Sequence, residues 1–431
     1  MEELPGRSGA WGYNTGMQPQ PEIPPALEHL QDPPADPPAL GAAIVFKTLA
    51  GLLISGLLVA LPGAILPFWR HHIESRYLLI ALYFLAQNAG LLGTRLWALR
   101  LGRAYGLAAA MSASCWLAVG GLLVMGVFSP DAHWGWRVGG LFLTGSAAGL
   151  MNMAVFASTS GAYERHPAAA VNVGGMFFGT GCLVCALAIG GGYFSYALPL
   201  TVLLLLLLPA AGCLLYIRAT IPDQPLRVAT HWAETAREFR SPAAILLALL
   251  LFVQFGNEGA IGGWLALFLT QKIGMSPASS IFLLALYFTA LLGGRILTQV
   301  LLGSVGHGRM LFGSVLMGLF GCLILASTNN SFGAVTGVLL CGLAFSAVLP
   351  LTFERIGDRF PYFRPGFSYG IFSIALTGGL LAPASIGLYA YWFGIDVVMV
   401  VPMIGSILVL LLVLLIFLEA RLHGSAKAAR V

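Results

Sequence analysis

Apolar and polar segments alternate regularly along the chain from Gly41 onward. Apolar stretches of about 20 residues or more, enough to cross a bilayer as an α-helix, are separated by short polar breaks. Twelve of these stretches are predicted to be transmembrane helices: 42–69, 76–99, 104–128, 135–158, 168–192, 196–217, 242–270, 277–303, 309–327, 332–353, 366–390 and 395–420. The pattern therefore predicts an all-α integral membrane fold.

Polar segments flank and divide the predicted helices. Residues 1–40 are rich in Pro, Gly and acids and lack an apolar core, so they are predicted to be a disordered cytoplasmic tail. They do not have the pattern of a signal peptide. The longest internal polar stretch, 218–241, is predicted to be a cytoplasmic linker between six-helix bundles at 41–217 and 242–420. Residues 421–431 form a second cytoplasmic tail.

A short pattern occurs once in each half of the chain. ALYF (Ala81–Phe84) is followed by LLGTRL (Leu91–Leu96) in the second predicted helix. The eighth helix contains ALYF (Ala285–Phe288) followed by LLGGRI (Leu291–Ile296). A duplicated six-helix unit with a site between its halves is typical of membrane transporters.

Composition supports the membrane assignment and excludes several other classes. Hydrophobic residues make up 58% of the 431 residues and charged residues only 9%, against about 25% charged in soluble domains. The net charge of +5 comes from scattered basic residues, which form no patch for nucleic acid. The chain has no P-loop, HExxH or GxSxG motif, so we expect neither an enzyme, an ATP-driven pump, a cofactor nor a metal site. The CxxC of Cys182 and Cys185 lies in an apolar helix with no nearby His, which favours packing residues.

Basic residues indicate the orientation. If the N-terminus is cytoplasmic, four of the 22 Lys and Arg residues lie outside and 18 lie in cytoplasmic loops, tails or adjoining helix ends. Positive residues concentrate on the cytoplasmic side of membrane proteins. Both termini are therefore predicted to be cytoplasmic, in a plasma or inner membrane.

The seventh predicted helix contains an isolated carboxylate. Glu258 is the only acid near the middle of an apolar stretch, and a carboxylate in hydrocarbon normally faces a cavity or a partner. Gln254, Asn257 and Trp264 lie at spacings of three and four residues that place them roughly on its helix face. Amides, a carboxylate and an indole suit a sugar. The alternatives are hydrogen bonds between helices for the amides and an interfacial anchor for Trp264.

Other helices add polar candidates for the same site. Candidate substrate contacts, with helix packing as the alternative, are Gln87, Asn88, Asn152, Asn172 and Tyr287.

Three arginines are assigned a different role. Counted along straight helices, Arg295 lies about 9 Å farther from the outer surface than Glu258, so a direct pair is not expected. Arg95, Arg103 and Arg295 are instead predicted to act in gating, with contact to lipid headgroups as the alternative for Arg95 and Arg295.

Several segments resemble the major facilitator superfamily, and more narrowly the branch of the fucose permease and related sugar symporters. The segments are SGLLVALPGAILPFW (Ser55–Trp69), NVGGMFFGTG (Asn172–Gly181), GNEGAIGGW (Gly256–Trp264), GLAFSAVLP (Gly342–Pro350) and GGLLAPASIG (Gly378–Gly387). The resemblance covers about residues 42–420. It implies a monomeric transporter in the lipid bilayer that takes up a small solute, a monosaccharide, by alternating access.

The chain departs from that family in its charged residues. Gly102 and Arg103 match the loop after the second helix, but Leu99 replaces the acid that usually precedes them. The first and fourth helices lack the carboxylates of the proton-coupled fucose permease. Coupling to H⁺ or Na⁺ through Glu258 and facilitated diffusion both stay open. The rival functions are export of drugs or lipids and a non-transporting membrane sensor.

Overall fold

The computed structural model describes residues 42–69, 76–128, 133–159, 167–194, 198–219, 221, 241–301, 304–360 and 365–428. The predicted tail at 1–40 and most of the predicted linker at 218–241 lie outside these residues. The described elements are α2 (Ala42–Ile65), the 3-10 turn η1 (Leu66–Phe68), α4 (Tyr77–Tyr105), α5 (Leu107–Phe128), α6 (Trp134–Ser158), α8 (Pro167–Phe194), α9 (Leu198–Leu205), α10 (Leu207–Ile217), α12 (Pro242–Lys272), α13 (Pro277–Leu301), α14 (His307–Ser327), α15 (Ser331–Arg359), α16 (Pro365–Phe393) and α17 (Val397–Ala428).

Twelve helical segments in this part of the chain are long and apolar enough to cross a membrane. Large apolar side chains such as Trp97, Trp116 and Phe332 are exposed, as expected for surfaces that face lipid. The helix is favoured because it satisfies every backbone polar group within one segment, where hydrocarbon offers no hydrogen bonds. The prediction of an all-α, multi-pass membrane protein is confirmed.

Three helices, α4, α15 and α17, continue well past their predicted ends, and one predicted helix is divided. Helix α15 ends at Arg359 and not at 353, and α17 continues to Ala428, through most of the predicted tail at 421–431. The second predicted helix ends at 99, but α4 continues to Tyr105, where Gly106 adopts a φ of 85° and ends it. Glycine takes this left-handed conformation without a steric penalty. The sixth predicted helix is divided at Leu206 into α9 and α10. Pro209 explains the break, because it lacks the N–H that would bond to the carbonyl of Leu205.

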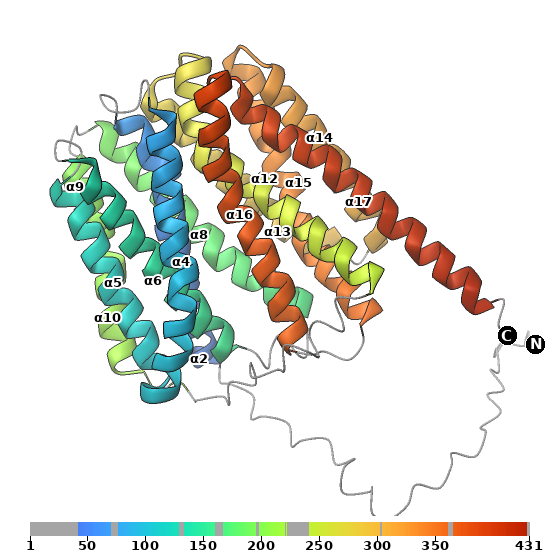
Figure 1. The fold of residues 1–431 in the computed structure, drawn as a ribbon, viewed down its shortest axis with the longest axis horizontal. Coiled ribbons are helices and arrows are strands. Elements are labelled where there is room, and N and C mark those ends of the chain that lie inside the picture. Colours follow the sequence, from blue (N-terminus) through green and yellow to red (C-terminus); the bar gives the residue numbers. More distant parts are fainter. Residues whose placement is uncertain are drawn as a thin grey trace, which may run out of the picture. The chain divides into compact units, whose positions relative to one another are not determined.

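The helices of each half of the sequence pack mainly among themselves. Helices α2 to α10 contact one another, as do α12 to α17, and Figure 1 shows these sets as blue-to-green and yellow-to-red ribbons. We call the end of the bundle where α2 begins and α17 ends the terminal end. The opposite end, where α12 ends at Lys272, is the far end.

The two helices that carry the repeated pattern make the main contacts between the halves. Helix α4, with the first ALYF, packs against α16, and α13, with the second, packs against α8. Further contacts join α2 to α12 and α8 to α15. The repeat therefore marks equivalent crossing helices, and the space between them holds the cavities described next.

Candidate functional site: a pair of cavities between the two halves

A cavity of about 190 Å³ lies between the two halves, at mid-depth and toward the far end. Its walls come from α2, α4, α6 and α8 on one side and from α12, α13 and α16 on the other. We call it the central cavity. Membrane transporters built from repeats bind their solutes in such a position.

A second cavity of about 260 Å³ adjoins the first and extends toward the terminal end, between residues such as Phe156, Val171 and Phe372. We call it the lower cavity. The residues that line both cavities are Leu91, Asn152, Gly175, Phe178, Phe255, Glu258, Arg295 and Leu376. The shared wall holds both charged residues of the two linings.

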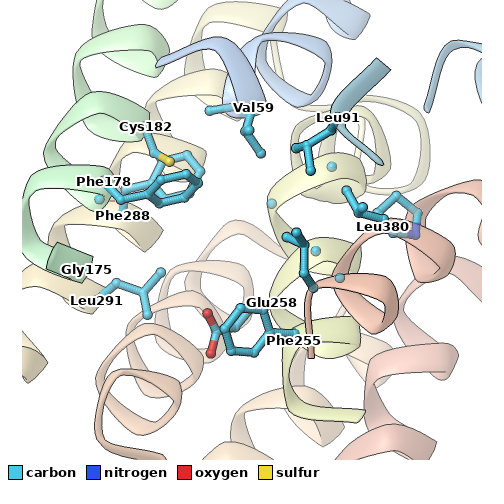
Figure 2. Close-up of a pocket in the computed structure, with 18 of the residues that line it drawn as sticks. Val59, Leu91, Gly175, Phe178, Cys182, Phe255, Glu258, Phe288, Leu291 and Leu380 are labelled. Carbon is cyan, nitrogen blue, oxygen red and sulfur yellow. The ribbon is translucent and has the colours of Figure 1, made fainter. Parts of the chain in front are cut away.

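Apolar side chains form most of the central cavity. Figure 2 shows Phe178, Cys182 and Phe288 on one side of the view and Leu380 on the other. The carboxylate of Glu258 lies at the opposite end of the view from Val59. The few polar groups in such a lining fix the orientation and identity of a ligand, while the apolar surface supplies contact area.

Glu258 faces this cavity from α12. One of its oxygens accepts a hydrogen bond from Nε2 of Gln254, one helical turn earlier, at 3.1 Å. Its carboxylate is close enough to Arg295 of α13 for an electrostatic interaction. No ion pair joins the two side chains, both of which the structure describes. The carboxylate therefore keeps acceptor capacity toward the cavity.

Arg295 reaches the cavity because the facing helix has a glycine. A Cβ on Gly175 of α8 would overlap the Arg295 guanidinium, so a side chain at this position would force the guanidinium to move. Only 7% of Arg295 is exposed, and its Nη1 atom is buried without a hydrogen-bond partner. Such a donor is ready for an acceptor that the described chain does not supply.

Two more polar atoms in the lining are buried without a partner. They are Oδ1 of Asn152, on α6, and the hydroxyl of Tyr287, on α13. Leaving a buried polar group without a hydrogen bond costs about 1–3 kcal/mol. Together with Arg295, these atoms place one acceptor, one hydroxyl and one cationic donor around the same space.

The two amides of α4 also line the central cavity, but their nitrogens already have partners. Nε2 of Gln87 donates to the Leu58 carbonyl of α2 at 2.8 Å. Nδ2 of Asn88 donates to the Leu380 carbonyl of α16, across the two halves. Their nitrogens thus hold helices together at the cavity wall.

The remaining polar candidates lie outside both linings. Asn257 faces α17, where its Nδ2 atom is 3.5 Å from Ser406 Oγ. Gln254 is buried behind Glu258. Asn172 donates to Gln299 of α13 at 3.4 Å, and its Oδ1 atom has no partner.

Trp264 is fully buried, so it does not have the exposure of an interfacial anchor. Its Nε1 atom donates to the Pro383 carbonyl at 2.8 Å, and its ring stacks on Phe84 of α4 with centroids 6.0 Å apart. Trp264 therefore joins the two halves on the far-end side of the cavity.

One of the predicted gating arginines, Arg103, lies at the terminal end. Arg103 is exposed in the last turn of α4. Arg95 also belongs to α4, and its side chain lies outside the described part of the structure.

Aromatic residues are the main part of the lining that polar patterns did not indicate. Phe84 and Phe288, the last residues of the two ALYF copies, both line the central cavity. The repeat is therefore the signal that could have identified them. Cys182 also lines this cavity, and its thiol donates to the Gly56 carbonyl at 3.3 Å. Among the described residues, no group of three His, Cys, Asp or Glu residues could hold a metal ion.

Comparisons with known proteins agree with this architecture. The chain is 30% identical over 220 residues to an uncharacterised MFS-type transporter of Yersinia pestis, a match that covers 51% of this chain and 54% of the relative. The structure resembles the E. coli fucose:proton symporter FucP with a TM-score of 0.57 and 13% identity, over 87% of this chain and 98% of that one. It resembles the nucleoside transporter NupG with a TM-score of 0.64 and 10% identity, over 87% and 99% of the two chains. Residues 48–379 match the family model of the Major Facilitator Superfamily. The chain therefore belongs to the Major Facilitator Superfamily, a superfamily of membrane transporters and not of enzymes.

Proposed function

We propose that this protein is a secondary transporter that binds a small polar solute in the central cavity and moves it by alternating access. One observation carries the proposal: Asn152 Oδ1, the Tyr287 hydroxyl and Arg295 Nη1 have no hydrogen-bond partner among the described residues, and all three residues line one cavity. Each unpartnered group costs about 1–3 kcal/mol. A solute that satisfies all three offsets this cost when it binds.

The position of the cavity suits movement of one half against the other. Each half contributes part of the lining, and one unpartnered atom comes from the first half and two from the second. A bound solute therefore links the halves directly. Rocking of the halves around a fixed central site would expose it first to one end of the bundle and then to the other.

A monosaccharide fits the mixture of groups in the lining. Hydroxyls can donate to Asn152 and exchange hydrogen bonds with Tyr287, while the rings of Phe178 and Phe288 offer faces for the CH surface of a sugar. FucP, which shares this fold, is a symporter of fucose and protons. We propose uptake by a monomer that lies in a plasma or inner membrane with both termini in the cytoplasm. The excess of basic residues in the loops and tails assigned to that side supports this orientation.

Counterflow in proteoliposomes tests the proposal. The purified full chain is reconstituted, and exchange of radiolabelled fucose, galactose, glucose and galacturonate is measured with and without Asn152→Leu. We expect exchange of at least one of these solutes, with an affinity about 5- to 10-fold weaker in the variant. Asn257→Leu, which changes a buried amide outside the cavity, is the matched control and should keep the original affinity. Equal affinities in Asn152→Leu and the unchanged protein would remove the cavity from the proposal.

Export of an amphipathic compound is the second candidate. The observation in its favour is the apolar character of the lining, which includes Phe84, Phe178, Phe255 and Phe288. The thermal unfolding temperature in detergent separates the two candidates. Stabilisation by a lipophilic cation such as tetraphenylphosphonium, with no response to sugars, would favour export.

A further inference from the structure

We propose that the solute is a small sugar acid whose carboxylate binds Arg295, and that it crosses together with one proton carried by Glu258. The inference rests on the proposed transport function and deepens it by giving the charge of the solute. It also gives Arg295 a role in binding, in addition to the gating predicted from its position in the sequence.

The surroundings of Arg295 are those of an anion-binding group. Arg295 lines both cavities, its guanidinium lies against Gly175, and its buried Nη1 atom has no acceptor in the described chain. The wall around it includes Leu291 and Leu292, which offer no hydrogen bonds. A planar guanidinium matches a carboxylate with two parallel hydrogen bonds, and such charge-assisted bonds are about twice as strong as neutral ones.

The charges of the cavity residues set the stoichiometry. Among the described lining residues, Glu258 is the acidic side chain and Arg295 the basic one, so the empty site is neutral when both are ionised. A monocarboxylate alone would bring the site to a net charge of −1 within the membrane, where uncompensated charge is costly. One proton on Glu258 restores neutrality. The loaded and empty sites then have equal charge, and transport moves no net charge.

Neutral sugars do not meet both conditions, which are a neutral loaded site and a carboxylate acceptor for Arg295. A neutral sugar with a proton on Glu258 would leave Arg295 as an uncompensated cation. A neutral sugar without a proton keeps the site neutral, but gives the guanidinium no carboxylate acceptor. A sugar acid with one proton meets both requirements and uses Asn152 and Tyr287 for its hydroxyls.

Few titratable groups face Glu258 from the surrounding helices. Arg295 and Tyr287 of α13 and Cys182 of α8 share the central cavity and interact electrostatically with it. In the described linings, α2, α4, α6 and α16 contribute no titratable side chain. Glu258 is therefore the carboxyl group on which the travelling proton is placed, and it lines both cavities.

Galacturonate and galactose make a matched pair of probes, since they differ by a carboxylate in place of a hydroxymethyl group. Purified full-length protein in proteoliposomes should exchange galacturonate and accumulate it when the interior is more alkaline. An imposed K⁺ diffusion potential should leave the initial rate unchanged, because each cycle carries no net charge. Glucuronate and gluconate complete the set of acids, and tetraphenylphosphonium serves as the lipophilic comparison.

Three substitutions test the assigned roles. Arg295→Gln should weaken galacturonate binding by about 10- to 100-fold. Glu258→Gln should keep galacturonate exchange and lose accumulation driven by the pH gradient. Gly175→Ala should weaken galacturonate binding in the same direction as Arg295→Gln, because the added methyl displaces the guanidinium. Gly293→Ala, at a position on α13 with open space around it, is the control and should retain the original affinity.

Other outcomes would overturn the inference in distinguishable ways. Exchange of galactose in preference to all three acids would remove the sugar acid and leave the transport proposal intact. Unchanged galacturonate affinity in Arg295→Gln would remove Arg295 from binding. If folded protein responds to tetraphenylphosphonium and to none of the sugars or acids, both proposals fail.

Discussion

Two groups of buried polar residues in the second half differ in whether their polar atoms have partners within the protein. Between α12, α14, α15 and α17, Asn257 lies 3.5 Å from Ser406, Ser406 is 3.3 Å from Cys322, and Cys322 is 3.7 Å from Cys341. We call this chain of contacts the internal network. In the central cavity, Tyr287 and Arg295 instead have polar atoms without partners.

The difference separates a structural polar group from a binding group. Burying a polar side chain within a helical membrane protein is costly in both places, but in the network, hydrogen bonds within the folded protein offset that cost. In the cavity the cost remains until a solute binds. An apolar substitution should therefore lower stability in the network, whereas in the cavity it should lower affinity and leave stability equal or higher.

Arg295→Met should give the largest contrast. Because Arg295 and Glu258 interact electrostatically, the change is made together with Glu258→Gln, which leaves no uncompensated charge in the cavity. Methionine keeps an unbranched side chain and removes an unpartnered buried donor, so we expect an increase of about 1–2 kcal/mol in the free energy of unfolding. Solute affinity should fall by about 10- to 100-fold. Thermal unfolding in detergent and counterflow measure the two effects. A fall in stability would show that the guanidinium has a structural role and would break the comparison.

Gly405→Ala should have the opposite signature. A methyl at this position on α17 would overlap the carboxamide of Asn257. Overpacking a close contact between helices costs about 1–3 kcal/mol, so the unfolding temperature should fall while the affinity for the solute stays the same. Gly313→Ala on α14 is the control, because no atom outside the adjoining backbone lies within 4 Å of the added methyl. A change in solute affinity without a loss of stability would show that the network affects binding in the cavity, which contradicts the comparison.

The sequence predicted the fold well because the bilayer leaves few choices. An apolar stretch of about 20 residues must satisfy its backbone groups internally, and the helix does so. The break between α9 and α10 was missed, since Pro209 lies in an apolar run and polarity was the criterion for dividing helices. The extension of α4 was missed because Arg100 and Arg103 resemble a loop, although no residue before Gly106 stops a helix.

The site was predictable only in part. Isolation of Glu258 among apolar residues indicated a cavity, and the structure places it there. Asn257 and Glu258 are neighbours, yet successive residues on a helix point about 100° apart, so Asn257 faces α17 instead. The count that separated Glu258 from Arg295 by about 9 Å assumed straight, parallel helices. It could not include tilt, side-chain length or the space left by Gly175.

Tyr287→Phe is a smaller change within the cavity. It removes one unpartnered hydroxyl and keeps the ring, which is buried beside Phe288. We expect a loss of about 1 kcal/mol in solute binding, or roughly fivefold in affinity, with an unchanged unfolding temperature. Binding isotherms and thermal unfolding of the same preparation measure both. A drop in stability at constant affinity would place this hydroxyl with the structural groups.

Gln87→Leu should have the smallest effect, and it is the sharpest test of the comparison. Gln87 lines the cavity, but its side-chain nitrogen is hydrogen-bonded within the protein, as in the network. Its Nε2 atom already donates to the Leu58 carbonyl at 2.8 Å, which ties α4 to α2. Leucine leaves that carbonyl without its side-chain donor, so stability should fall by about 0.5–1 kcal/mol. Solute affinity should change by less than about threefold, because one of the two N–H groups on this nitrogen is already bonded and holds the amide against α2. If affinity falls by more than this while stability holds, then position in the wall, and not the absence of an internal partner, decides which residues bind.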